Sequence, residues 1–150
     1  MKYYAGLDLG GTFVKGGIVD EEGNILVKDK IPTGKERPYE EIAKDMAELA
    51  AELAKRANVP AGALAAAGIG SPGLIDSVKG IVVYNNNLGW KKAALAAEVK
   101  KYLGVPVYVT NDANAAALGE SFAGAAKQYG SSIFVTLGTG VGGGIIIDGK

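Results

Sequence analysis

The first 31 residues consist of short apolar-rich runs separated by turn-forming residues, a pattern that predicts β-strands. The runs span residues 3–9, 12–19 and 24–31, and only Gly10–Gly11 separates the first two. A two-residue glycine connection between apolar runs is typical of a β-hairpin. The pattern therefore predicts three consecutive antiparallel strands, with a second turn at residues 20–23.

A helical period replaces this pattern between Pro38 and Ala57. Apolar residues recur there every three or four positions, at Ile42, Met46, Leu49 and Leu53. The same reasoning predicts the other elements: strands at 63–69, 81–84, 105–110, 132–137 and 144–147, and helices at 91–103 and 112–126. The order β-β-β-α-β-α-β-α predicts an α/β fold, a mixed sheet with helices on its faces, followed by a C-terminal β-hairpin.

Composition limits the chemistry open to this chain. Its 150 residues are 48% hydrophobic, and 16 basic and 16 acidic residues leave no net charge to attract nucleic acid. The absence of cysteine and histidine excludes disulfides, Cys/His zinc sites and every mechanism that needs an imidazole base. No apolar run approaches the roughly 20 residues of a membrane span, and the N-terminus has no signal-peptide pattern, so we expect a cytoplasmic protein.

The 23 glycines are clustered, and the first cluster fits two interpretations. Residues 8–12 (DLGGT) form either a tight hairpin or a phosphate-binding loop. In a phosphate-binding loop, backbone N–H groups approach the anion and the Thr12 hydroxyl adds a donor, while Asp8 holds hydrated Mg²⁺ on the same phosphates. Residues 138–144 (GTGVGGG) suggest a second turn of this kind, which presents Thr139.

Two glycine clusters also match the dinucleotide fingerprint G-x-G-x-x-G, at residues 68–73 and 138–143. That fingerprint opens a helix in dinucleotide-binding folds, whereas strand-like residues follow both clusters here. The sequence therefore does not favour a dinucleotide site.

Asn111 and Asp112 stand between a predicted strand and an alanine-rich helix. Asp112 could cap this helix, a role worth about 1 kcal/mol. Because α/β ligand sites form at the carboxyl ends of strands, it could also accept a proton from a substrate hydroxyl, with Asn111 orienting the same substrate. The loop residues Asn85–Asn87, near Trp90, fit either turn chemistry or polar contacts to a sugar.

Taken together, these segments resemble the ROK family of sugar kinases, in the actin/hexokinase superfamily. The matching stretches are AGLDLGGTFVKGGIVD (5–20), GIGSPGLID (68–76), NNLGW (86–90), VPVYVTNDANAAALGE (105–120) and FVTLGTGVGGGIIIDGK (134–150). Only their combination, in order over nearly the whole chain, is specific. The resemblance implies a ribonuclease H-like mixed sheet, with residues 1–130 as an N-terminal lobe and residues 131–150 as the first hairpin of a second lobe.

The resemblance also implies residue roles. Asp112 matches the catalytic base, and Asp8 matches the metal-binding aspartate. The sugar-binding positions implied are Gly70, Ser71, Asn87, Asn111 and Asp112. The nucleotide phosphate-binding positions implied are Gly10, Gly11, Thr12, Gly138, Thr139 and Gly140. The implied cofactors are ATP and Mg²⁺, and a hexose is the implied partner, with neither nucleic acid nor a membrane involved.

Departures from the family pattern leave two hypotheses open. The 150 residues lack the family segment whose Glu and His bind sugar hydroxyls, and they lack its cysteine-rich zinc motif. The chain is then either a weakened, glucokinase-like kinase that transfers phosphate from ATP to a hexose hydroxyl, or a non-catalytic lobe that binds phosphate weakly and self-associates. We expect a homodimer, because Phe134, Val135 and Ile145–Ile147 would be poorly covered in an isolated hairpin.

Overall fold

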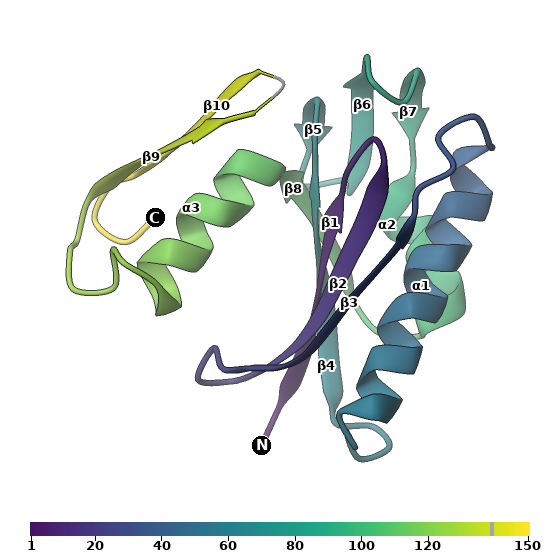
Figure 1. Ribbon diagram of the computed structural model, residues 1–150, viewed down its shortest axis with the longest axis horizontal. Helices are drawn as coiled ribbons and strands as arrows, with labels where there is room; N and C mark the ends of the chain where they lie inside the picture. Colours follow the sequence, from purple (N-terminus) through teal and green to yellow (C-terminus); the bar gives the residue numbers. More distant parts are fainter. Residues whose placement is uncertain (139) are drawn as a thin grey trace.

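The computed structural model describes residues 1–138 and 140–150, and a five-stranded mixed sheet forms its centre (Figure 1). Its strands, in the order β3-β2-β1-β4-β8, are β1 (Tyr3–Leu9), β2 (Phe13–Asp20), β3 (Ile25–Pro32), β4 (Leu64–Ser71) and β8 (Val107–Asn111). The first three strands pair antiparallel, as predicted, whereas β4 runs parallel to both β1 and β8. The carboxyl ends of three parallel strands therefore meet at one edge of the sheet.

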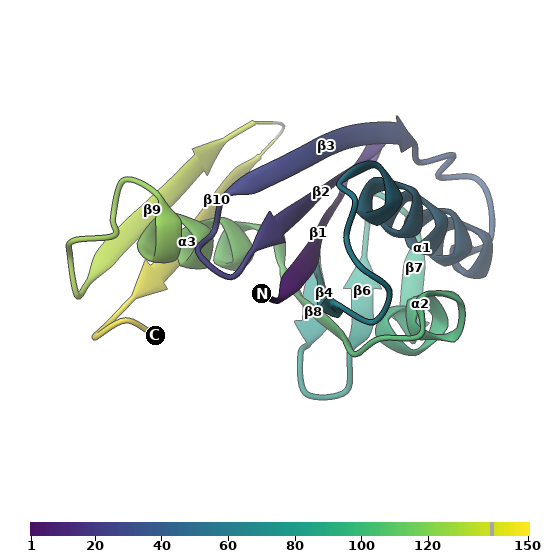
Figure 2. The same cartoon turned by 90° about the horizontal axis from the view of Figure 1, so that it is seen from below.

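Helices cover both faces of this sheet (Figure 2). α1 (Tyr39–Arg56) and α2 (Leu95–Leu103) lie on one face, and α3 (Asp112–Ala123) lies on the other. The predicted fold class, a mixed α/β sheet with helices on its faces, is confirmed. In the part of the chain that the structure describes, no helix combines the length and the apolar character needed to cross a membrane.

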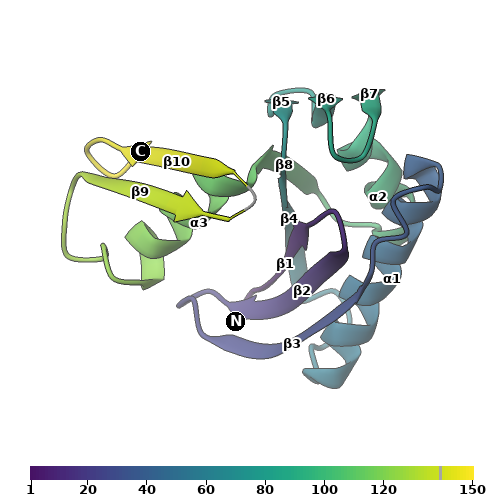
Figure 3. The ribbon, with the colours of Figure 1, turned by 45° about the horizontal axis from the view of Figure 1, so that its top comes forward.

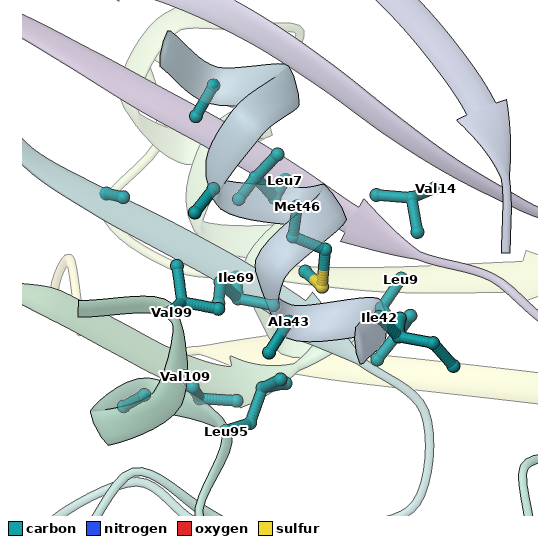
Figure 4. Packing of buried hydrophobic residues seen from close by; sticks show 14 of the residues in the cluster. Leu7, Leu9, Val14, Ile42, Ala43, Met46, Ile69, Leu95, Val99 and Val109 are labelled. Carbon is teal, nitrogen blue, oxygen red and sulfur yellow. The ribbon is translucent and has the colours of Figure 1, made fainter. Parts of the chain in front are cut away.

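The main core lies between α1, α2 and the sheet (Figure 4). Ile42, Met46 and Leu53 of α1 are fully buried there, as their helical spacing predicts. Complete burial of each such side chain stabilises the fold by about 1.5–3 kcal/mol. Gly16 of β2 permits the close approach of α1, because a Cβ at this position would lie 2.9 Å from Leu53 Cδ1.

A small antiparallel sheet corrects the prediction of a helix over residues 91–103. Its strands are β5 (Leu74–Asp76), which the sequence analysis did not predict, β6 (Ile81–Asn85) and β7 (Trp90–Ala93). Trp90 pairs with Asn85, and its ring is buried 5.9 Å from the ring of Tyr39. This burial and strand pairing outweigh local helix propensity, so the helix begins only at Leu95.

The C-terminal hairpin is present, but its elements differ from the predicted ranges. β9 (Ser132–Leu137) pairs with β10 (Val141–Ile146), so the second strand begins before residue 144, while α3 ends at Ala123 rather than 126. The two strands form a sheet of their own, beside α3 and apart from the central sheet (Figure 3). The division into lobes at residue 130 stays a prediction.

Only one side of this hairpin is covered, which partly corrects the expected exposure. Ile146 is buried and Phe134 half-buried on the side that faces α3. The opposite side is formed by exposed aliphatic residues, at Ile133, Val135, Leu137, Val141 and Ile145. The register places these five residues on one face, together with Gly143. We call this surface the outer hairpin face.

Candidate functional site

Asp8, Gly70 and Asp112 lie around one cavity at the carboxyl edge of the parallel strands. Asp8 is near the end of β1 and Gly70 near the end of β4, while Asp112 follows β8 directly. The cavity has a volume of about 410 Å³, and Phe134 and Thr136 of the hairpin form part of its wall. The topology therefore brings together three residues that are 42 or more positions apart in the sequence.

Burial and two charged neighbours determine the pKa of the Asp8 carboxyl. Burial raises the pKa of the Asp8 carboxyl above its ordinary value of 3.8, and the nearby Asp112 carboxylate raises it further. Lys15 acts in the opposite direction and lowers the pKa. Lys15 is the cross-strand partner of Asp8 in the β1–β2 hairpin, and the sequence analysis did not single it out. The site thus combines two carboxylates with one ammonium group.

Asn111, and not Asp112, is the N-cap of α3, which corrects the capping interpretation. The Asn111 side-chain oxygen accepts hydrogen bonds from the N–H groups of Ala113 (3.0 Å) and Asn114 (3.3 Å). Asp112 Oδ1 also accepts from Ala113 N, at 2.9 Å, whereas Asp112 Oδ2 has no hydrogen-bond partner among the described residues. One oxygen of Asp112 therefore remains available to a ligand in the cavity.

Gly70 and Ser71 differ in their relation to this cavity. A Cβ at Gly70 would lie 3.3 Å from Asp112 Cα, so glycine permits the N-terminus of α3 to approach β4. Ser71 is fully buried, and its hydroxyl donates to the carbonyl of Pro72. The Ser71 side chain does not line the cavity, and its role as a sugar ligand stays a prediction.

The first glycine turn is wider than predicted. Leu9 and Val14 are the last paired residues of β1 and β2, so the four residues 10–13 lie between them, and Gly10 N donates to Phe13 O at 3.0 Å. A Cβ at Gly10 would lie 2.7 Å from Phe13 O, whereas a Cβ at Gly11 would meet nothing within 4 Å. The turn therefore requires glycine at position 10, whereas the space beside Gly11 is open.

Gly11 and Thr12 line a second cavity, of about 480 Å³. The loop after β3 and Asn87 form the rest of its wall, with Lys35 and Glu36 contributing charged side chains. The structure therefore places Asn87 beside the first glycine turn rather than in the cavity that holds Asp112. Its neighbour Asn85 is buried and supports the loop, because it donates to Pro72 O and accepts from Leu88 N.

The second glycine turn connects β9 and β10. Gly138 N donates to Gly140 O at 2.9 Å, and both residues are exposed. Neither lines either of the two cavities. Thr139 lies outside the described residues. The phosphate-binding role of this turn stays a prediction.

The residues around Asp8 fit a magnesium ion that is shared with phosphate groups. Mg²⁺ usually keeps several waters and takes only one or two protein carboxylates when phosphates supply other ligands. Asp8 alone meets this requirement, which leaves Asp112 free for another role. A closed metal cage is not found in the described part of the chain, which contains no group of three or more His, Cys, Asp or Glu side chains that could hold a metal.

The sequence of the chain matches one protein family and several curated proteins. The family model described as "ROK family" matches residues 4–150. Glucokinases from Streptomyces coelicolor and Thermotoga maritima are 41% and 39% identical to the chain, and a xylose repressor from Bacillus subtilis is 34% identical. These alignments cover 96–97% of the chain but only 38–44% of the relatives. The chain thus spans less than half the length of the curated relatives it matches.

Solved structures of sugar kinases are also similar to the chain. A ROK family glucokinase from Streptomyces griseus, in complex with glucose and AMPPNP, has a TM-score of 0.86 at 39% identity and is covered to 45%. A ROK hexokinase from Thermus thermophilus also has a TM-score of 0.86, at 37% identity. An inorganic polyphosphate/ATP-glucomannokinase from Arthrobacter sp. strain KM has a TM-score of 0.85, at 38% identity. In these three comparisons, at least 99% of the chain is covered.

Proposed function

Because the chain belongs to the ROK family, we propose that it forms the proton-accepting and phosphate-binding part of an ATP- and magnesium-dependent sugar kinase. The observation that carries this proposal is the meeting of Asp8 and Asp112 in one cavity at the carboxyl edge of the parallel strands. A hexose is the proposed acceptor, since glucokinases are among the relatives. The first glycine turn is the proposed phosphate site.

Asp112 is the proposed general base. As the acceptor hydroxyl oxygen forms its bond to the γ-phosphorus, the bond from phosphorus to the ADP oxygen breaks and the hydroxyl proton passes to the Asp112 carboxylate. Asp112 Oδ2 suits this role because no described residue donates a hydrogen bond to it. The Asn111 oxygen is bound to the helix, and its amide nitrogen donates one hydrogen bond to Gly73 O at 3.4 Å, so the second hydrogen of that nitrogen would be the group that contacts the sugar.

Asp8 and the first glycine turn would handle the phosphate charge. The N–H of Gly11 is free of backbone partners in the described structure, and a phosphate oxygen could accept from it. Asp8 would hold Mg²⁺, which neutralises negative charge on the transferring phosphoryl group. Lys15 would keep Asp8 ionised, because its positive charge lowers the pKa of that carboxyl.

A coupled assay for ADP release, with ATP, Mg²⁺ and a panel of hexoses, tests the proposed function. Release that depends on one or more sugars would support it. Absence of release with every sugar, while Mg²⁺-dependent nucleotide binding is intact, would instead favour the non-catalytic lobe. Absence of both release and nucleotide binding would refute the proposal.

Nucleotide binding should be weak and centred on the phosphates. The glycine turn supplies backbone donors, whereas neither cavity near it is lined by a stack of aromatic side chains that could hold an adenine ring. We expect a favourable binding free energy of about 4–6 kcal/mol, which corresponds to a Kd between tens of micromolar and about 1 mM. Calorimetry with Mg²⁺-ADP and with adenosine measures the contrast, and equal affinities would contradict phosphate-centred recognition.

Replacing Asp8 by asparagine should stabilise the fold at neutral pH while weakening Mg²⁺-dependent binding. Because the folded state raises the pKa of Asp8, ionising this carboxyl costs more in the folded than in the unfolded chain. The destabilisation is present above the folded-state pKa and disappears as the pH falls below the ordinary value of 3.8. We expect a gain below about 1 kcal/mol, because solvent screens a partly exposed carboxylate.

Urea unfolding of the wild type and the Asp8→Asn variant, at neutral and at successively lower pH, measures this effect. The difference in the free energy of unfolding should shrink toward zero in acid. A difference that stays constant with pH would show that ionisation of Asp8 is not its cause.

We also propose that the chain self-associates through the outer hairpin face. This face presents five aliphatic side chains, 59–80% exposed, and no charged residue. Full burial of such a side chain is worth about 1.5–3 kcal/mol, so the ten side chains of two copies would together gain at most about 15–30 kcal/mol. That upper bound exceeds the cost of association, about 4–15 kcal/mol. A twofold contact would let the same face cover itself in both copies.

A further inference from the structure

Thr33 is a buried polar residue that the functional assignments leave unused. It follows β3 directly and is 0% exposed. Its hydroxyl donates to Gly10 O at 2.7 Å, and its backbone N–H donates to Thr12 O at 2.9 Å. Both bonds end on the first glycine turn, more than 20 positions earlier in the chain. One residue of the β3–α1 loop therefore holds two carbonyl groups of the turn.

These two bonds fix the orientation of the turn's peptide groups. In a planar trans peptide, the C=O of one residue and the N–H of the next point in opposite directions, and no peptide bond described here is cis. Because the Gly10 carbonyl is directed at the Thr33 hydroxyl, the Gly11 N–H points away from Thr33. The Gly11 N–H has no hydrogen-bond partner among the described residues. The orientation that Thr33 imposes thus leaves this donor free.

Thr33 is itself anchored to α1. Its carbonyl accepts from Arg37 Nη2 at 3.0 Å, and the same nitrogen donates to Asp45 Oδ2 at 2.6 Å. Asp45 belongs to α1, whose neighbouring residue Met46 is fully buried in the core. A chain of hydrogen bonds therefore connects the core helix to the glycine turn through Arg37 and Thr33.

We propose that Thr33 is a positioning residue for the phosphate-binding turn. It does not contact the phosphate; it holds the Gly10 and Thr12 carbonyls so that the Gly11 N–H is presented to an anion in the adjoining cavity. Gly11 and Thr12 line this cavity together with Lys35, which attracts an anion, and Glu36, which repels it. A preorganised donor binds an anion without first ordering the loop that carries it. This inference rests on the proposed phosphate-binding function of the turn.

Two substitutions of Thr33 distinguish the effect of its hydroxyl group from the effect of its side-chain shape. Thr33→Val keeps the branched shape but leaves Gly10 O without its donor, while Thr33→Ser keeps the hydroxyl. Val99→Ala is the control for general destabilisation, because Val99 is fully buried in α2, a helix that packs chiefly against α1, β8 and β6. We expect Thr33→Val to weaken the binding of Mg²⁺-tripolyphosphate about tenfold, and Thr33→Ser to restore most of the affinity.

Two measurements make the outcome decisive. Calorimetry with Mg²⁺-tripolyphosphate gives the affinities, and amide hydrogen exchange by NMR reports whether the Gly10 N–H remains protected by Phe13 O. Faster exchange at Gly10 together with weaker binding in Thr33→Val, but neither change in Val99→Ala, supports the inference. Unchanged affinity in Thr33→Val, or an equal loss in Val99→Ala, overturns it.

A different result would refute the proposed function rather than the role of Thr33. A wild-type chain that does not bind tripolyphosphate would refute phosphate binding at the turn, and with it the functional part of the inference. Exchange at Gly10 would then still decide whether Thr33 holds the turn, because this measurement needs no ligand.

Discussion

Replacing Asp112 by asparagine should lower phosphoryl transfer by about 10²–10⁴-fold while leaving phosphate binding nearly intact. Asparagine has nearly the same shape but cannot accept the hydroxyl proton at neutral pH. The fold should tolerate the change, because Asn111 is the N-cap of α3 and its two hydrogen bonds do not involve Asp112. The ADP-release assay measures turnover, and calorimetry with Mg²⁺-ADP measures binding.

Asp76→Asn is a matched control for this variant. Asp76 is the last residue of β5, and its Oδ1, like that of Asp112, accepts a backbone hydrogen bond, from Lys79 N at 3.0 Å, but Asp76 does not line the Asp112 cavity. Turnover should be unaffected by this change. If Asp112→Asn kept wild-type turnover, Asp112 would not be the general base.

Replacing Val135 by glutamate should convert a dimer into a monomer. Val135 lies between Ile133 and Leu137 on β9 and opposite Gly143, at the middle of the outer hairpin face. In a twofold contact, the substitution would bury two carboxylates of like charge in an apolar interface, which is strongly unfavourable. Light scattering over a dilution series measures the mass of the species in solution.

Val78→Glu is the matched control, because Val78 is 98% exposed in the loop between β5 and β6 and is not part of the outer hairpin face. It adds the same charge to another exposed valine and should leave the dimer unchanged. A wild-type chain that stays monomeric at every concentration would refute self-association through this face.

Strands and helices with a strong local pattern could be predicted from the sequence. The three N-terminal strands follow from apolar runs between turn residues and α1 follows from its helical period, and all four lie close to their expected positions. The strand at residues 90–93 could not be predicted from local apolar spacing. Their strand depends on pairing with β6 and on burial of Trp90 against Tyr39, contacts between residues far apart in the chain.

The site could be predicted only where motifs coincide with strand ends. Asp8 and Asp112 met this condition. Lys15 did not, and the predicted two-residue turn at Gly10–Gly11 would have paired Lys15 with Gly6 rather than with Asp8. The four-residue turn shifts the register by two positions, which keeps Lys15 on the same face and moves it opposite Asp8. Thr33 carries no motif, and its role depends on a contact with Gly10 that no local pattern reveals.

The packing of α3 against the hairpin implies that stability is unevenly distributed in the molecule. At the closest approach this contact is made of small residues: a Cβ at Gly144 would lie 2.5 Å from Ala117 Cβ and 2.9 Å from Ala113 O. The buried residues of α3 are only Ala113 and Ala117, whereas those of α1 include Ile42, Met46 and Leu53, so separating the hairpin from α3 costs less free energy than opening the core beneath α1. Phe134 and Thr136 belong to this hairpin and form one wall of the Asp112 cavity. Local opening of the least stable unit would therefore control access to the cavity, while the rest of the sheet stays folded.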